Sequence, residues 1–141
     1  VMILGIGSDL VDISRIERSI DRFGDRFLSR IFTDRERDRA DSKANRAAVY
    51  AKRFAAKEAV WKALGEEDRP GIQWRELEVI NDASGKPSFE LSGIAAARLL
   101  KITPEGLVAR VDLSLTDEPP MAQAFVVISA EVPGLRDKAG G

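Results

Sequence analysis

The sequence contains neither cysteine nor histidine among its 141 residues. The absence of cysteine excludes disulfide bridges, thiolate metal sites and cysteine nucleophiles. The absence of histidine removes the most frequent general base and the most frequent zinc ligand. Catalysis by this chain would therefore have to use carboxylates, lysine, arginine, hydroxyl groups or metal-bound water. Any metal that it binds should be a hard ion that prefers oxygen ligands, such as Mg²⁺.

Long apolar runs and an excess of one charge are also absent. No stretch approaches the roughly 20 apolar residues of a membrane span, and the first residues lack the pattern of a secretory signal. The 22 basic and 23 acidic residues leave a net charge of -1, which argues against bulk electrostatic binding to nucleic acid or a membrane surface. We therefore expect one cytoplasmic domain spanning residues 1–141, with residues 136–141 as a frayed tail.

Apolar periodicity predicts an α+β domain in which one strand is followed by helices and then by a largely antiparallel sheet. The first strand is expected at 2–11, where Gly5 and Gly7 indicate close approach to another element. The predicted helices are at 13–23, 25–31, 43–64 and 93–102, and the predicted later strands are at 77–81, 88–91, 107–115 and 122–132.

Local signals support the helix boundaries. Asp12 can cap the helix at 13–23, and Gly24 can end it. Thr33 followed three residues later by Glu36 reads as a capping box. The helix at 43–64 is the longest and ends at Gly65, and small side chains along one of its sides would let another element approach closely.

Glu58 and Lys62 are four residues apart on this long helix, so their side chains share one face. A surface ion pair is one interpretation, but the neighbouring residues are unusually apolar for a solvated face, which favours a cleft. Asp9 stands near the end of the glycine-bearing strand. Because Asp12 is better placed to cap the next helix, Asp9 remains a candidate functional group.

Arginines at 15, 18, 22 and 26 form a basic ridge beside acidic residues at 17, 21 and 25. This pattern is typical of a solvated helix face with internal salt bridges. It would also suit a ridge that docks an acidic partner protein.

Three sequence blocks occur in a distinctive order: MILGIGSDLVDISRIER at 2–18, KRFAAKEAVWKALG at 52–65 and NDASGKP at 81–87. Together with the apolar strands between 113 and 128, they resemble the holo-acyl-carrier-protein synthases, the short bacterial type of 4′-phosphopantetheinyl transferase. The resemblance covers residues 2 to about 130. It implies that family's α+β fold and transfer of phosphopantetheine from coenzyme A to a serine of apo acyl carrier protein, in fatty acid biosynthesis, releasing 3′,5′-ADP.

The resemblance also implies roles for individual residues. Asp9 and Glu58 match the family's magnesium ligands, and Lys62 matches the lysine one turn beyond, which would neutralise or protonate the departing 3′,5′-ADP. The general base would be Glu58 or a metal-activated water. The implied coenzyme A site contains Arg53 and Phe54, the loop residues Gly65 and Pro87, and, as a weaker candidate for phosphate contact, Arg46.

Further implications concern partners and departures from the family pattern. The helix bearing Arg15, Arg18 and Arg22 matches the helix that docks the acidic carrier protein. The family forms homotrimers with active sites at subunit interfaces. Asp112 and Asp117 stand where relatives often carry histidine, so any histidine contribution to nucleotide binding or proton transfer is lost here.

Two other functions fit parts of the pattern. A magnesium-dependent nucleotide or phosphate hydrolase could use Asp9, Glu58 and Lys62, although no phosphate-binding P-loop is present. An α+β binding module could use the arginine ridge alone to dock an acidic protein.

Overall fold

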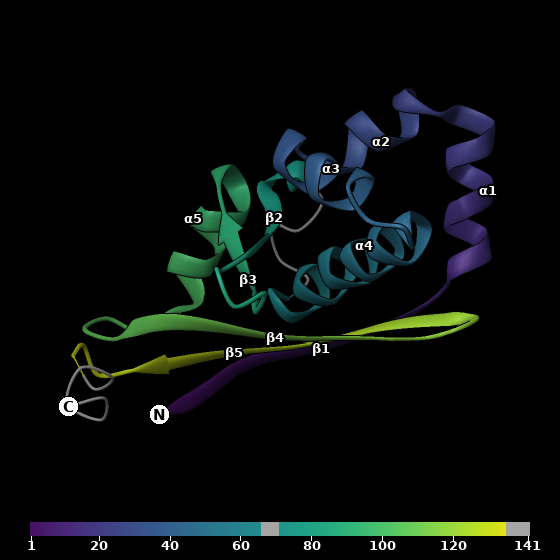
Figure 1. Cartoon of the computed structure of the whole chain (residues 1–141). Helices are drawn as coiled ribbons and strands as arrows, with labels where there is room; N and C mark the ends of the chain where they lie inside the picture. The colour runs from purple at the N-terminus through teal and green to yellow at the C-terminus, as the bar shows by residue number, and fades with distance from the viewer. Residues whose placement is uncertain (66–70, 135–141) are drawn as a thin grey trace.

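The computed structural model describes residues 1–65 and 71–134 (Figure 1). The elements, in chain order, are β1 (Met2–Asp12), α1 (Ile13–Phe23), α2 (Asp25–Ile31), α3 (Asp34–Asp41), α4 (Arg46–Ala63), the 3₁₀ turn η2 (Trp74–Glu76), β2 (Leu77–Asn81), β3 (Pro87–Leu91), α5 (Gly93–Ile102), β4 (Val108–Glu118) and β5 (Met121–Glu131). The predicted α+β class, and the order of its elements, is confirmed.

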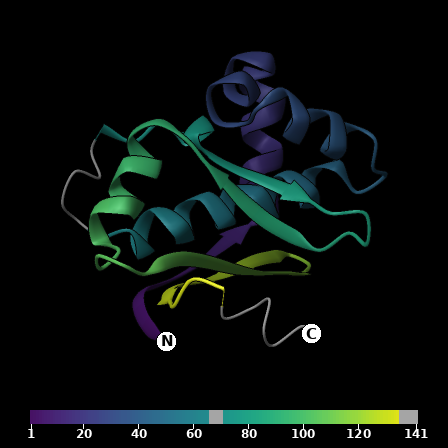
Figure 2. The same cartoon turned by 90° about the vertical axis from the view of Figure 1, so that its left-hand side faces the viewer.

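The strands form two antiparallel sheets around the long helix α4. The larger sheet has the order β1-β5-β4, and the smaller is the hairpin β2-β3. Figure 1 shows α4 lying along the larger sheet, with α2 and α3 on the side of α4 away from it, and Figure 2 shows the β2-β3 hairpin crossing over α4. The sequence-based expectation of one sheet differs in this detail, because in the described residues the hairpin strands pair with each other and with no strand of the larger sheet.

The two glycines of β1 bring that strand against α4. A Cβ atom added at Gly7 would lie 1.8 Å from the carbonyl oxygen of Ala59, and one added at Gly5 would lie 2.0 Å from that of Ala63. Contacts this short are impossible for any side chain, so only glycine allows β1 to pack directly on the helix backbone. The predicted close approach is confirmed, and its partner is α4.

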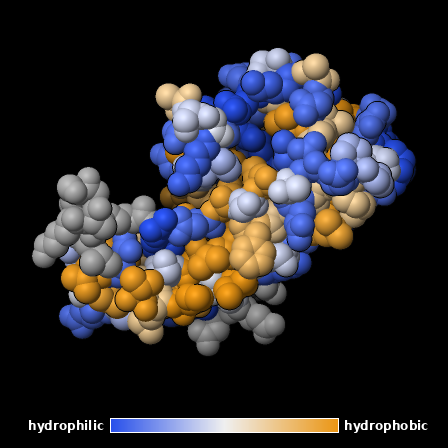
Figure 3. Space-filling model, turned by 60° about the horizontal axis from the view of Figure 1, so that its bottom comes forward, coloured by the Kyte–Doolittle hydropathy of each residue, from blue (hydrophilic) through white to orange (hydrophobic). Residues whose placement is uncertain are grey.

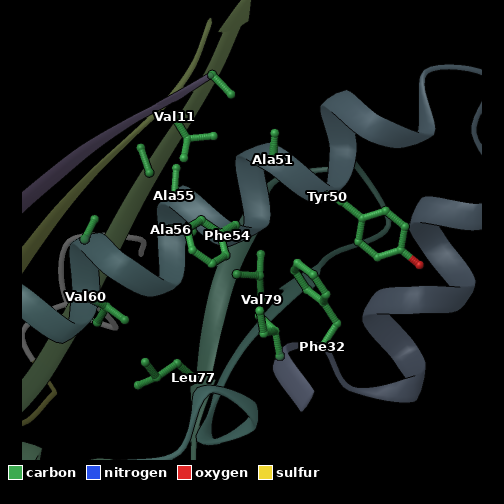
Figure 4. Close-up of a cluster of buried hydrophobic side chains, with 14 of the residues drawn as sticks. Val11, Phe32, Tyr50, Ala51, Phe54, Ala55, Ala56, Val60, Leu77 and Val79 are labelled. Atoms are coloured by element: carbon green, nitrogen blue, oxygen red, sulfur yellow. The ribbon is translucent and has the colours of Figure 1, made fainter. Parts of the chain in front are cut away.

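The core lies on both sides of α4, which is buried along most of its length. Figure 4 shows Val11 of β1 and Ala55 of α4 on the sheet side, and Phe32 and Val79 on the hairpin side. Because α4 is covered by both layers, apolar residues occur around nearly its whole circumference.

A buried ion pair ties α3, α4 and β2 together. Lys57 Nζ donates to Glu36 Oε1 at 2.7 Å and to the carbonyl oxygens of Trp74 and Leu77. Glu36 in turn accepts from the backbone amides of Thr33 and Val79. Both side chains are fully buried, and burial lowers the pKa of Lys57. Every polar atom of the pair thus has a partner, as a buried charge requires.

The predicted caps are confirmed, but one helix boundary was wrong. Asp12 accepts from the amide of Ser14, and Thr33 and Glu36 form the expected capping box. Helix α4 begins at Arg46 rather than at 43. The amides of Ser42 and Lys43 instead bond back to the carbonyls of Asp38 and Ala40, so these residues finish α3.

Within residues 1–65 and 71–134, no helix is long and apolar enough to cross a membrane. The tail predicted at 136–141 lies outside the described residues.

Candidate functional site

Asp9, Glu58 and Lys62 meet where β1 crosses α4. Gly5, Gly7 and Asp9 are every second residue of β1, so they lie on the same face of the strand, the face that packs on α4. Because the two glycines let the strand approach the helix closely, Asp9 lies next to α4. Lys62 Nζ lies 3.1 Å from Asp9 Oδ1 and 3.3 Å from the carbonyl oxygen of Ser8. The three predicted residues therefore form one cluster.

The charges of the cluster act on one another. Burial, followed by repulsion from the Asp9 carboxylate, raises the pKa of Glu58, while Lys62 and Arg15 act in the opposite direction. Asp9 is 16% exposed and Lys62 is 46% exposed at the side chain. Two carboxylates that repel each other beside an accessible lysine are chemically suited to a cation and a phosphate.

The donor set of Asp9 and Glu58 fits Mg²⁺. In the described part of the chain, no three acidic side chains gather at one point. Mg²⁺ uses one or two carboxylates and completes its shell with water and substrate phosphates. A pair of carboxylates is therefore a sufficient protein contribution for this ion, whereas a zinc or calcium site would need more protein ligands.

A basic cavity of about 300 Å³ lies farther toward the N-terminal end of α4. Four of its lining side chains are cationic, and none of the described lining residues is acidic. Its lining comprises Arg39, Lys43, Asn45, Val49, Lys52, Arg53, Asn81, Gly85, Pro87 and Leu115. Such a cavity attracts an anionic ligand.

Arg53 is the most buried cation of this cavity, with only 3% of its surface exposed. One guanidinium nitrogen donates to Asn81 Oδ1, but Nε has no hydrogen-bond partner in the described structure. Burial lowers the pKa of Arg53. A buried donor without an acceptor is costly, so the site is suited to a ligand that supplies one.

The turn at 82–87 forms another wall of the cavity, and hydrogen bonds within the turn stabilise it. Asp82 Oδ1 accepts from the amides of Ser84 and Lys86, and Asn81 Nδ2 donates to the carbonyl of Gly85. The predicted loop residue Pro87 begins β3 at the end of this turn. The NDASGKP block is thus a rigid wall and not only a connection.

The remaining residues predicted for coenzyme A lie elsewhere in the single chain. Arg46 is held by Asp41 at 2.6 Å and covers the Tyr50 ring. Gly65 ends α4 with φ of +86° beside the guanidinium of Arg98. Neither residue lines the basic cavity.

Phe54 lines a separate, mostly apolar cavity of about 510 Å³ between α2, α4 and η2. Phe23, Phe27, Ile31 and Trp74 form its apolar walls, and Arg26 and Arg30 are its charged members. This cavity adjoins the surface of α1 because Phe23 borders both.

The predicted arginine ridge is on the surface of α1. Arg15, Arg18 and Arg22 are exposed and line a shallow hollow together with Phe23. Arg15 also lies close enough to Glu58 to affect its pKa. The ridge therefore runs from the carboxylate cluster to the apolar cavity.

Sequence reasoning missed several residues. Arg39, Lys43 and Lys52 of the basic cavity were not singled out, although Lys52 adjoins Arg53 and Arg39 is four residues from Lys43. Asp117 pairs with Lys52 at 2.9 Å, whereas Asp112 lies on the other face of β4 beside Arg110. Only the folded chain brings these distant segments together.

Comparisons with known proteins identify the family of this chain. Residues 5–117 match the family model described as the 4′-phosphopantetheinyl transferase superfamily. A holo-[acyl-carrier-protein] synthase of Nitrobacter hamburgensis is 58% identical over 137 residues, covering 94% of this chain and 99% of that protein.

Solved structures are also similar. The holo-[acyl-carrier-protein] synthase of Neisseria meningitidis has a TM-score of 0.76 and 37% identity, covering 91% of this chain and 99% of that one. The synthase of Bacillus anthracis, solved in complex with CoA (3′,5′-ADP), has a TM-score of 0.69 and 32% identity, covering 91% and 97%. This chain belongs to the 4′-phosphopantetheinyl transferase superfamily and, within it, to the holo-[acyl-carrier-protein] synthase family.

Proposed function

We propose that this chain is a Mg²⁺-dependent holo-acyl-carrier-protein synthase. It transfers the 4′-phosphopantetheine group of coenzyme A to a serine of apo acyl carrier protein and releases 3′,5′-ADP, in the service of fatty acid biosynthesis in the cytoplasm. The observation that carries the proposal is that α4 bears Glu58 and Lys62 beside Asp9 of β1 and also bears Arg53, which lines the basic cavity five residues before Glu58.

The two features match the two phosphate-bearing parts of coenzyme A. Arg53 and Glu58 are five residues apart on α4, which separates them by about 7 Å along the helix axis and by about 140° around it. We place the pyrophosphate at the carboxylate cluster and the ribose 3′-phosphate in the basic cavity. The unpartnered Nε of Arg53 supports this placement, because a phosphate oxygen would satisfy it.

The chemistry moves a phosphoryl group from one oxygen to another, so positioning and charge neutralisation carry most of the catalysis. The serine oxygen attacks the β-phosphorus, and the bond from that phosphorus to the bridging oxygen of 3′,5′-ADP breaks. Lys62 would neutralise or protonate that leaving oxygen. Glu58, or a water activated by the metal, would accept the serine proton.

Asp9 and Glu58 would hold Mg²⁺. When bound, the ion neutralises phosphate charge and can lower the pKa of a bound water. In the absence of the ion, Lys62 partly balances the two carboxylates through its contact with Asp9.

The surface of α1 is the proposed docking site for the carrier protein. Arg15, Arg18 and Arg22 offer an exposed basic ridge, and the apolar cavity that contains Phe54 begins at its end. An acidic partner with an exposed apolar side chain would match both features. Because Arg15 is close to Glu58, a carrier docked here would bring its serine near the cluster.

We further propose a homotrimer assembled through the larger sheet. Its outer face, opposite α4, exposes apolar side chains that a single chain leaves uncovered, as Figure 3 shows. Ile6 and Leu10 of β1 and Phe125 of β5 are 56%, 59% and 47% exposed. A contiguous apolar face of this kind is typical of a protein–protein interface.

Release of 3′,5′-ADP from coenzyme A, followed by chromatography, tests the proposed reaction. Release should require Mg²⁺ and apo carrier together. Release without any carrier would indicate a hydrolase, and carrier binding without any release would indicate a binding module; either result would contradict the proposal.

A further inference from the structure

Lys52 lines the basic cavity and also forms an ion pair with an acidic residue outside it. Its Nζ lies 2.9 Å from Asp117 Oδ1, and the two side chains are 23% and 27% exposed. Lys52 lines the cavity, whereas Asp117 does not. The cation is thus available to a ligand but already has a partner in the free protein.

The surroundings of the pair favour an anion as the ligand. Arg39, Lys43 and Arg53 line the same cavity, and the described lining contains no carboxylate. The buried Nε of Arg53 has no acceptor. A phosphate group entering the cavity would therefore meet several donors and no fixed negative charge except the one behind Lys52.

The two partners differ in how far they can move. Asp117 belongs to β4 and is held in register opposite Ala122 of the central strand β5, so its short side chain stays at the sheet. Lys52 projects from α4 on a flexible four-carbon chain. Only the lysine side chain can therefore move toward a bound ligand. A phosphate carries more negative charge than one carboxylate, so it would attract the lysine more strongly than Asp117 does.

We propose that Lys52 is a phosphate-binding residue of the coenzyme A site and that Asp117 is the counter-ion which the phosphate displaces from it. The inference rests on the proposed function, since it assumes coenzyme A as the ligand. Asp117 then limits the affinity for coenzyme A and for 3′,5′-ADP, which carry the same 3′-phosphate. A product held less tightly leaves the site more readily.

Calorimetric titration of 3′,5′-ADP into the full chain tests the inference. Lys52→Met should weaken binding about tenfold, as expected for the loss of a charge-assisted hydrogen bond. Lys52→Arg should retain most of the affinity. Asp117→Asn should tighten binding about threefold, because the ligand no longer competes with a carboxylate. Adding Asp117→Asn to Lys52→Met should change little, because Asp117 acts through Lys52.

Two controls keep these results interpretable. Asp25→Asn removes the partner of Arg37, a cation that is also 23% exposed but does not line the cavity, and should leave the affinity unchanged. Titration with 5′-AMP, which lacks the 3′-phosphate, should show less than a twofold effect of Lys52→Met.

The outcomes separate this inference from the proposed function. If the wild-type chain binds neither 3′,5′-ADP nor coenzyme A, the proposed function itself fails. If the wild type binds but Lys52→Met leaves the affinity unchanged, Lys52 is not a ligand and only this inference fails. A loss of affinity in Asp117→Asn would likewise overturn the counter-ion role.

Discussion

Lys62 donates to Asp9 across the junction of α4 and β1, at 3.1 Å, and so joins the two elements that form the carboxylate cluster. The sequence pattern had left open a simple ion pair with Glu58, one turn earlier on the same helix. In the described structure Lys62 instead bridges to the strand. The lysine, although 46% exposed, therefore belongs to a site that tertiary packing builds.

Replacing Lys62 by methionine should reduce kcat more than it raises KM for coenzyme A. In the proposed mechanism the lysine neutralises charge that develops on the leaving oxygen, and such interactions contribute mainly in the transition state. We expect a fall of about 10²–10³-fold in kcat, comparable to the loss of one stabilising donor. Steady-state kinetics measure the change. A rise in KM alone would assign Lys62 to ground-state binding.

Replacing Glu58 by glutamine should raise the stability of the protein while lowering its activity. Its pKa is raised by burial and by Asp9, so the folded state takes up this proton more readily than the unfolded chain. Above that pKa, the ionised carboxylate therefore opposes folding. In metal-free buffer at pH 7, Glu58→Gln should melt at a higher temperature than the wild type while losing transfer activity.

The difference in melting temperature should disappear near pH 3, where the carboxyl is protonated in both states. Thermal unfolding at the two pH values measures it. A Glu58→Gln protein that is less stable than the wild type at pH 7 would contradict the assigned pKa direction.

The arginine ridge predicts a charge-dependent effect on the carrier protein alone. Arg22→Glu should raise KM for the carrier by about tenfold, with KM for coenzyme A unchanged, because Arg22 lies in the exposed hollow of α1. The effect should shrink at high salt. Arg75→Glu, a charge reversal at an exposed site on η2, is the matched control. Equal loss of affinity for both substrates would refute a docking role.

The outer face of the larger sheet predicts the oligomeric state. Ile6→Glu places a charge in the centre of the exposed apolar face, opposite Val127 of β5. Burying this charge in an interface would cost several kcal/mol, so a trimer should dissociate. Light scattering after size exclusion measures the mass. A wild-type monomer, or an unchanged trimer in the variant, would show that this face is not the interface.

The buried Glu36–Lys57 pair predicts a non-additive effect on stability. Lys57→Met leaves Glu36 without its counter-ion and should cost about 3–5 kcal/mol. Glu36→Gln/Lys57→Met removes both charges and keeps an acceptor for one of the two amides of Thr33 and Val79, so it should recover part of that loss. Urea denaturation of both variants measures the difference. Equal stability of the two variants would contradict an electrostatic role.

Local signals predicted most of the fold because they depend on near neighbours. The Asp12 cap and the Thr33–Glu36 capping box are decided within four residues. Gly5 and Gly7 indicated a close contact, but the sequence could not name α4 as the partner. The division into two sheets was missed because periodicity describes each strand alone and not which strands pair.

The same distinction applies to the site. Asp9, Glu58 and Lys62 could be proposed as one site because they stand in recognisable motifs, and the structure brings them together. The Lys52–Asp117 pair joins residues that are far apart in the sequence, and Lys57 reads as an ordinary helix lysine until Glu36 is seen beside it. Ion pairs between distant segments leave no local pattern, so only the structure reveals them.

The central claim is tested most directly by the intact mass of an apo acyl carrier protein after incubation with this chain, coenzyme A and Mg²⁺. The account predicts that the carrier gains the mass of one phosphopantetheine group. The gain should be absent with a chelator, with Glu58→Gln, and with a carrier whose acceptor serine is alanine. An unchanged carrier mass, from a chain that binds both coenzyme A and the carrier, would contradict the account.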